Sequence, residues 1–483
     1  MIKCKYSGSV NRTGKFQEAP GVARMAGMTR VAGMTGTIGV CRVLLALVAL
    51  CVSQNALSQD AGLSFRDTRL AQKMLGALTE TMIRDITAPP VASRDYVYSM
   101  IAFYEAARPG KPGYKTFAGK LNGLATREGD SAVLPSPDPG LAYNWLVAGA
   151  AAFHKTAYAL VFSKDLFQHL YDSAGGEIRT RKIPADVYAR SVKFGEEVAS
   201  VILRWTKQDQ YGYTRTLPRF TPSKDSGTWQ QTGPEYMEAV EPHWDQIRPM
   251  TLTKAHQFAV PEPAAFKTEA FTKEYMEVYH LSQTMTKDQR AFALFWDCNP
   301  YAVQTVGHLM YSIKKISPGG HWMGITSNAI NQQRQGLVEA LYAYSLVSVA
   351  VFDGFISAWD EKYRSNYVRP ITAIQQLYAP TWEPLLQTPP FPEYPSAHSV
   401  ISMASAMVLT GLYGDHFQYT DSVEKSFGLP NRSFHSFVEA AREAAMSRLY
   451  GGIHFREAVE NGELMGQQIG QQIVEKFGLK RPD

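Results

Sequence analysis

Cysteine is scarce in this 483-residue chain, and its distribution excludes a disulfide-stabilised fold. The four cysteines are Cys4, Cys41, Cys51 and Cys298, and the first three lie near the N-terminus. No C-x-x-C pair and no zinc-type spacing occurs. If residues 1–58 are removed, only Cys298 remains. The fold must then be held together by its hydrophobic core alone.

An excess of one charge sign is also missing once the N-terminal segment is set aside. The formal net charge of the whole chain is +5. Residues 1–58 contain seven basic residues and one acidic residue, so residues 59–483 carry a formal charge of about −1. This near-neutral balance gives no support to nucleic-acid binding.

Long apolar runs are scarce as well. The most apolar stretch of residues 59–483 is Ala340–Phe352, whose length suits a buried core helix better than a membrane span. Near the N-terminus, basic residues precede the short apolar run Val43–Val52, and the small residues Ala56 and Ser58 follow it. We predict that residues 1–58 are a signal peptide and leader. The protein would then be exported, periplasmic or secreted, without a membrane span after cleavage. The alternative is a buried N-terminal helix.

Helical periodicity runs through most of the remaining chain, without persistent β-alternation. We predict an all-α multi-helix bundle, with an N-terminal helical region at 59–270 and a C-terminal helical region at 271–483. Residues 207–268 are rich in proline, glycine and aromatic residues and interrupt the helical periodicity. We expect them to form either a functional lid or a surface connection. The expected helices are Ser64–Arg84, Ala92–Ala107, Leu141–Val161, Pro184–Trp205, Lys273–Gln283, Lys287–Trp296, Tyr301–Lys315, Asn328–Trp359, Ser399–Leu412 and Phe434–Tyr450.

Two basic residues form the first of three chemical motifs. Lys362 and Arg369 are seven residues apart, so on one helix they would point to the same side. Two cations on one face require either a shared anion or open solvent. Taken alone, the pair fits a solvated basic edge.

The second motif is Ser396-Ala397-His398, which follows a proline-rich turn and opens an apolar helix. The free N–H groups and the dipole of a helix N-terminus favour an anion. The hydroxyl of Ser396 and the backbone N–H of Ala397 are therefore candidate donors. Ser396 can equally serve as the helix N-cap.

The third motif places Arg448 and His454 on either side of Gly451-Gly452, where the preceding helix is expected to stop. The resulting turn can bring His454 back toward Arg448. Arginine offers fork-shaped donors for oxoanion edges, and lysine supplies a point charge. Three cations, one hydroxyl and two histidines together predict a pocket for a tetrahedral oxoanion, phosphate or vanadate.

The order of these motifs resembles the signature shared by vanadium-dependent haloperoxidases and the phosphatidic acid phosphatase type 2 superfamily. That signature reads Lys-x6-Arg-Pro, Pro-Ser-Gly-His and Ser-Arg-x5-His, and it covers about a fifth of the chain. Asp353–Trp359 and Pro389–Tyr394 are similar to the chloroperoxidase branch. Phe295–Asp297 resembles a family segment that holds an aspartate near the catalytic histidine. The resemblance implies the all-α bundle of this superfamily.

The resemblance also implies an activity and a role for each residue. The enzyme would oxidise halide with hydrogen peroxide at a vanadate cofactor and pass the oxidised halogen to an organic acceptor. His454 would coordinate vanadium, His398 would be the acid–base residue, and Lys362 would polarise the bound peroxide. The oxoanion would be bound by Lys362, Arg369, Ser396, Ala397 and Arg448. Trp359 and Phe391 would line the halide side.

Two other functions remain open on the same residues. A soluble acid phosphatase would bind phosphate, use His454 as the nucleophile that forms a phosphohistidine, and use His398 to protonate the leaving group. A non-catalytic helical protein would only bind the oxoanion. The oligomeric state is not indicated by the sequence.

Two positions depart from the family pattern. Ala397 replaces the glycine of Pro-Ser-Gly-His, which costs about 1 kcal/mol if the position requires a positive φ. Ala458 replaces an acid that often stands four residues after the last histidine, which leaves Glu457 or Glu460 as candidates to orient His454. Another histidine, His321, follows a turn, and we expect it to be structural rather than to face the pocket.

Overall fold

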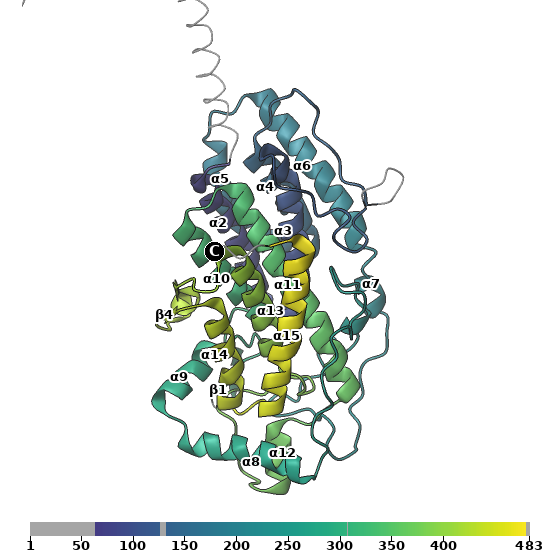
Figure 1. Ribbon diagram of the computed structural model, residues 1–483, viewed down its shortest axis with the longest axis vertical. Helices are drawn as coiled ribbons and strands as arrows, with labels where there is room; N and C mark the ends of the chain where they lie inside the picture. The colour runs from purple at the N-terminus through teal and green to yellow at the C-terminus, as the bar shows by residue number, and fades with distance from the viewer. Residues whose placement is uncertain (1–62, 126–131, 307, 480–483) are drawn as a thin grey trace, which may run out of the picture. The chain divides into compact units, whose positions relative to one another are not determined.

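The computed structural model describes residues 63–125, 132–306 and 308–479 (Figure 1). The leader predicted at 1–58 lies outside these residues. The predicted all-α class is confirmed within the described part. The helices are α2 (Phe65–Arg84), α3 (Pro89–Ala107), α4 (Trp145–Leu160), α5 (Lys164–Arg179), α6 (Ala185–Thr206), α7 (Tyr211–Thr214), α8 (Glu269–Thr284), α9 (Lys287–Phe295), α10 (Pro318–Gln333), α11 (Leu337–Ser365), α12 (Pro370–Leu377), α13 (Ala397–Tyr413), α14 (Phe437–Tyr450) and α15 (Arg456–Phe477).

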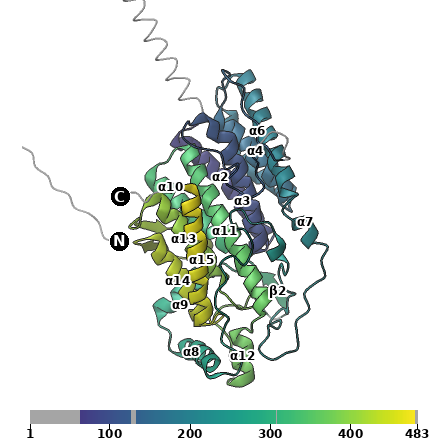
Figure 2. The same ribbon diagram turned by 45° about the vertical axis from the view of Figure 1, so that its right-hand side comes forward.

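The 29-residue helix α11 is the central element of the core. It packs against α3 and α13, and it runs alongside α3 and α15 in both views (Figures 1 and 2). It is the one helix of the described residues that is long and apolar enough to cross a membrane. However, 94% of its most apolar 18-residue window is buried inside the protein. Such burial is typical of a core helix, whose apolar side chains are removed from water.

Helices α13 and α15 approach each other closely because glycines line their contact. Gly462, Gly466 and Gly470 recur at four-residue spacing on α15. A Cβ atom on Gly466 would lie 2.2 Å from the carbonyl oxygen of Val400, and one on Gly462 would lie 2.8 Å from that of Ser396. Only glycine allows this approach, which fixes the N-terminal end of α13 against α15.

Several expected helices have different bounds or a different structure. Residues 301–315, expected as a helix, instead contain the antiparallel hairpin of β1 (Val303–Val306) and β2 (Leu309–Ser312). The β-branched residues of β1 favour extended backbone. A second small sheet pairs β3 (Tyr419–Asp421) with β4 (Arg432–Phe434).

The expected helix Asn328–Trp359 is two helices. α10 ends at Gln333, its C-cap Arg334 has a left-handed φ of 49°, and α11 starts after Gly336. The helices α5, α7, α12 and α15 were not predicted.

Residues 207–268 contain only α7 and the 3-10 turn Trp244–Gln246. This segment lies against α11. The carbonyl of Val240 accepts hydrogen bonds from Trp359 and Tyr363, and the backbone N–H of Val240 donates to Pro390. The segment therefore covers the end of α11 that carries the first motif. The proposed division of the chain near residue 270 stays a prediction.

Candidate active site

Lys362 and Arg369 reach the same place from two different elements. Lys362 lies in the last turn of α11, which ends where Asn366 adopts a left-handed φ of 46°. Arg369 is the extended N-cap of α12, directly before Pro370, and proline disfavours helical backbone in the residue before it. The prediction that both cations lie on one helix face is therefore wrong. They still converge, because their charged ends lie 5.2 and 5.0 Å from the centroid of the Phe391 ring.

Lys362 is fully buried and holds the loop that precedes α13. Its ammonium group donates to the carbonyl oxygens of Pro392 at 3.0 Å, Glu393 at 2.9 Å and Pro395 at 2.6 Å. All three N–H donors are thereby used. In this geometry Lys362 acts on a neighbouring anion through its charge and through the shape of the loop.

The second motif starts α13 as predicted. Ser396 is the N-cap, and its hydroxyl accepts a hydrogen bond from the backbone N–H of Ser399. Ala397 is the first helical residue and has no positive φ. Alanine therefore carries no left-handed strain here, and the expected cost of about 1 kcal/mol does not arise. The first N–H groups of a helix have no partner within the helix, and the cap uses that of Ser399, so the N–H groups of Ala397 and His398 are the ones that α13 offers to an anion.

The third motif folds as the glycines indicate. α14 ends at Tyr450, Gly451 is its C-cap, and Gly452 has a φ of 75°. The turn returns the chain so that Nε2 of His454 lies 3.2 Å from Nη1 of Arg369. Both side chains are buried.

A glutamate that sequence reasoning missed orients His454. Nδ1 of His454 lies 2.8 Å from Oε1 of Glu393, and the same oxygen accepts the backbone N–H of Phe455 at 2.9 Å. This contact leaves Nε2 on the side of Arg369. The only signal in the sequence was an acid inside the proline-rich segment before His398.

The expected partners of His454 are occupied elsewhere. Glu457 accepts a hydrogen bond from the backbone of Ala264, and Glu460 forms an ion pair with Arg456. The prediction that one of them orients His454 is wrong. Both belong to α15, whereas the carboxylate of Glu393 approaches from the loop before α13.

His398 is placed so that it can accept and donate a proton. Its side chain is hydrogen bonded to the backbone of Trp296, while its Nε2 is buried and has no partner among the described residues. Burial, together with the charges of Arg448, His321 and Lys362, lowers the pKa of His398 well below its usual value. A neutral imidazole with an unpartnered nitrogen can accept a proton.

His454 is also held neutral. Burial lowers its pKa well below the usual value, and the nearby cations, first Arg369 and then Lys362, act in the same direction. Neutral imidazole is the form that coordinates a metal.

The three cations of the site lack sufficient counter-charge. Burial lowers the pKa of Lys362 far below its ordinary value, that of Arg369 to about 9, and that of Arg448 below its ordinary value. Burial likewise raises the pKa of Glu393 to about 8. Arg448 lies 3.8 Å from an oxygen of Asp297, which is too long for a hydrogen bond.

Several buried donors around His454 lack a partner within the described residues. They are Nη2 of Arg369 and both Nε and Nη2 of Arg448. Each unsatisfied buried donor costs about 1–3 kcal/mol. An oxoanion beside His454 would satisfy these donors and neutralise the cations. The residues present therefore fit vanadate, with neutral His454 as its ligand and arginines at its oxygens.

An apolar wall adjoins the cations, as predicted for the halide side. The rings of Trp359 and Phe391 lie 4.9 Å apart between centroids, and the Lys362 ammonium lies 6.0 Å from the centroid of Trp359. Nε1 of Trp359 donates to the carbonyl of Val240, which fixes the indole. A buried cation beside apolar rings suits a large, weakly hydrated anion better than a small, strongly hydrated one, because the rings offer nothing that replaces lost water.

His321 does not reach this site. It lies with Cys298, Asp421 and Glu424, and its ring stacks on Trp296 at 4.6 Å. The expectation that His321 does not face the oxoanion pocket agrees with this placement. The Phe295–Asp297 segment does lie beside the site, since Trp296 accepts a hydrogen bond from Arg448.

The fold and the site have counterparts in known proteins. A family model described as the VCPO second helical-bundle domain matches residues 342–381 and 375–479. No match is found among curated proteins. The crystal structure described as the first bacterial vanadium-dependent iodoperoxidase is similar, with a TM-score of 0.78 and 42% sequence identity, over 84% of this chain and 96% of that chain.

Two further structures share the fold. The holo-type and apo-type structures of a bacterial vanadium-dependent chloroperoxidase have TM-scores of 0.58 and 0.59 at 17% identity. Each covers 81% of this chain, and this chain covers 92% and 94% of theirs. The identity and coverage of the iodoperoxidase match, together with the site described above, assign the chain: it belongs to the vanadium-dependent haloperoxidase family.

Proposed function

We propose that this protein is a haloperoxidase that oxidises halide with hydrogen peroxide, with vanadate bound at His454. The observation that carries the proposal is the group of buried, unpartnered arginine donors beside a neutral histidine. Such donors are expected where a protein binds a multiply charged oxoanion. Family membership gives the same cofactor and the same class of reaction.

Each residue has a defined task. His454 offers Nε2 as the single protein ligand, and Glu393 holds the ring by its Nδ1. Arg369 and Arg448 donate to the oxygens, as do the Ser396 hydroxyl and the first N–H groups of α13. Lys362 supplies positive charge. Bound vanadate is the Lewis acid that activates peroxide toward halide.

His398 is the residue that moves a proton. Its pKa is lowered by burial and by neighbouring cations, so it is neutral at neutral pH. Its unpartnered Nε2 can accept the proton that hydrogen peroxide loses on binding and return it during turnover. Replacement of His398 by alanine should therefore reduce turnover while oxoanion binding largely remains.

The preferred halide in this proposal is iodide. The 42% identical structure is described as an iodoperoxidase, and the match extends over most of both chains. The wall of Trp359 and Phe391 beside Lys362 offers little compensation for the hydration shell of a small anion. Iodide loses its hydration most easily among the halides, so it suits this wall best.

Paired assays on one purified protein test the proposal. One sample is loaded with vanadate and supplied with peroxide and iodide, bromide or chloride. The other is kept free of vanadate and supplied with a chromogenic phosphomonoester. We expect halide-dependent turnover, highest with iodide, that disappears without vanadate and in His398→Ala. Phosphomonoester hydrolysis that vanadate inhibits, without halide oxidation, would instead make the protein a phosphatase.

We also propose export to the periplasm or the medium. The support is the basic, apolar and small-residue order of residues 1–58. N-terminal sequencing of protein recovered from cell fractions tests it. A mature N-terminus near residue 59 in the exported fraction supports export, and full-length protein in the cytoplasm opposes it.

A further inference from the structure

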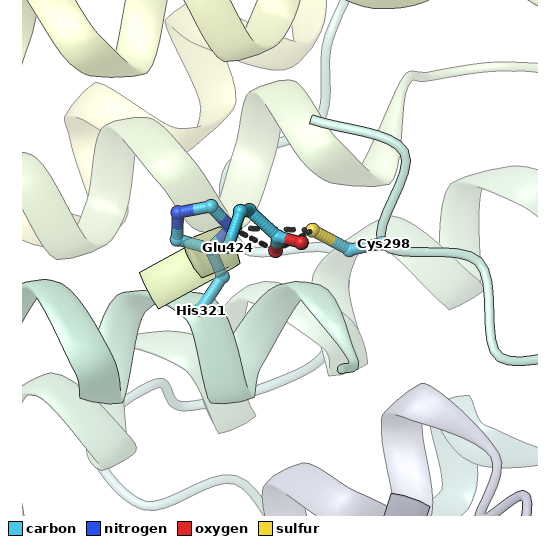
Figure 3. Close-up of side chains that lie close together, drawn as sticks. All are labelled: Cys298, His321 and Glu424. Atoms are coloured by element: carbon cyan, nitrogen blue, oxygen red, sulfur yellow. Dashed lines mark hydrogen bonds and ion pairs between the residues drawn. The ribbon is translucent and has the colours of Figure 1, made fainter. Parts of the chain in front are cut away.

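A second buried cluster lies apart from the proposed vanadate site. Figure 3 shows its three side chains, Cys298, His321 and Glu424, turned toward one another. Cys298 follows α9, His321 lies in the first turn of α10, and Glu424 lies in the 3-10 turn Val423–Phe427. Their residues are 2%, 0% and 6% exposed, so none is a surface group.

The distances within the cluster fit a metal ion. Nδ1 of His321 lies 3.3 Å from Sγ of Cys298 and 3.0 Å from Oε1 of Glu424, and the sulfur and oxygen are 3.8 Å apart. A tetrahedral zinc ion with bonds of about 2.0–2.3 Å separates its ligand atoms by about 3.4–3.6 Å. Shifts of a few tenths of an ångström would convert the observed triangle into one face of that tetrahedron.

A fourth side chain orients the histidine. Nε2 of His321 lies 2.7 Å from Oδ2 of Asp421, which is fully buried, and the other Asp421 oxygen accepts the backbone N–H of Val423. With Nε2–H donating to Asp421, Nδ1 faces Cys298 and Glu424 and is the nitrogen that would bind an ion. Metal-binding histidines commonly donate their second nitrogen to a carboxylate in this way.

Charge supports the same conclusion. Without an ion, two buried carboxylates face one histidine. A divalent ion among the three ligand atoms would supply positive charge to these buried carboxylates, and Cys298 would bind it as the thiolate.

We propose that Cys298, His321 and Glu424 bind a divalent metal ion of the zinc class, with Asp421 as the residue that positions His321. Thiolate and imidazole ligands select zinc or a similar borderline ion over magnesium and calcium. The three protein ligands leave a fourth position for water.

Two features adjoin the cluster. A cavity of about 240 Å³ is lined by Ile83 and Ile316, which also pack with Cys298. On the other side, the carbonyl of Trp296 accepts Nη1 of Arg448 at 2.7 Å. An ion at Cys298 would therefore hold in place the segment that aligns Arg448 for the oxoanion.

Metal content tests the proposal directly. The full chain, freed of vanadate, is incubated with zinc or cobalt(II), dialysed, and examined by mass spectrometry of the metal and by absorption of the cobalt form. We expect about one equivalent of either metal and a sulfur-to-cobalt charge-transfer band. Cys298→Ser should remove that band and lower cobalt affinity at least 100-fold. Asp421→Asn, which keeps all three ligands, should lower affinity about 10- to 100-fold.

The controls separate binding at this cluster from binding at the surface or at the vanadate site. His169 is an exposed histidine of α5, and His169→Gln should bind the metal as the wild type does. His454→Ala should retain the metal even if it binds no vanadate, so failure of the proposed function leaves this result independent. Circular dichroism checks that each variant is folded. Absence of retained metal in the wild type, or an unchanged cobalt spectrum in Cys298→Ser, would overturn the proposal.

Discussion

Two buried polar clusters meet at one short segment, Trp296–Cys298, and their chemistry is opposite. The carbonyl of Trp296 faces the oxoanion site, where arginine donors lack partners. The thiol of Cys298 faces a histidine and a carboxylate, which offer lone pairs. The first cluster offers hydrogen-bond donors to an anion, and the second offers lone pairs to a cation. The segment between them is the physical link through which occupancy of one can affect the other.

In both clusters a buried acidic side chain contacts one ring nitrogen of a histidine and holds the ring in place. Glu393 holds His454, and Asp421 holds His321, at 2.8 and 2.7 Å. The surroundings decide the protonation. Burial and the Arg369 charge lower the pKa of His454, whereas Asp421, together with Cys298, outweighs burial and raises that of His321. Similar histidine–carboxyl pairs thus lie among cations in one cluster and among acidic groups in the other.

The largest effect is expected at the histidine of the anion site. His454→Ala removes the only proposed protein ligand of vanadium, so halide oxidation should fall on the order of 10³-fold or more. Vanadate titration and steady-state iodide oxidation measure the change. His169→Ala, on an exposed face of α5, is the matched control and should keep both properties. Unchanged vanadate affinity in His454→Ala would contradict the assignment.

A smaller effect is expected at the carboxylates. Glu393→Gln keeps the shape of the side chain but replaces the carboxyl group that holds Nδ1 of His454 with an amide, so vanadate affinity should fall about 10- to 100-fold. Asp421→Asn should leave vanadate affinity nearly intact, since it acts on the other histidine. Glu457→Gln is the control for a nearby acid that does not touch His454. If Glu393→Gln and Glu457→Gln lose vanadate affinity equally, Glu393 has no specific role in holding His454. Equilibrium titration of each variant measures the affinities.

The third prediction concerns α15, which packs against α13, the helix that Ser396 caps. A methyl group at Gly466 would collide with the backbone of Val400, so Gly466→Ala should destabilise the protein by about 1–3 kcal/mol. Gly76 lies on the exposed side of α2, and a methyl group there would have no atom within 4 Å, so Gly76→Ala should stabilise by about 0.5–1 kcal/mol. Urea unfolding midpoints at equal slope measure both changes. If Gly466→Ala leaves the free energy of unfolding unchanged, α15 can move away from α13.

The anion site was largely predictable because its motifs are local. Ser396 and Ala397 sit at a helix N-terminus that the preceding prolines indicate, and Gly451-Gly452 ends a helix where glycines usually do. The seven-residue spacing of Lys362 and Arg369 did not predict their placement, because the two residues belong to different elements. The left-handed Asn366 between them is stabilised by the folded surroundings, and periodicity carries no information about it.

The carboxylate partners and the second cluster were not predictable in this way. Glu393 and His454 are 61 residues apart, and Cys298 and Glu424 are 126 apart. No fixed spacing connects such pairs, because packing of α9, α10 and the 3-10 turn Val423–Phe427 brings them together. The hairpin of β1 and β2 was missed for a related reason, since its short strands give little alternation to detect.

The smallest effect is expected at Ala397, where this chain departs from the family signature. Ala397 starts α13 with no positive φ, so Ala397→Gly gains nothing from the freedom of glycine and loses about 0.5 kcal/mol of helix stability. The backbone N–H and the Ser396 cap are unchanged, so vanadate affinity should stay within about twofold. Ala404→Gly, in the buried interior of the same helix, should cost about 1 kcal/mol or more and serves as the comparison. A tenfold gain in vanadate affinity for Ala397→Gly would show instead that the methyl group narrows the pocket, and that the anion site is limited by space rather than by its donors.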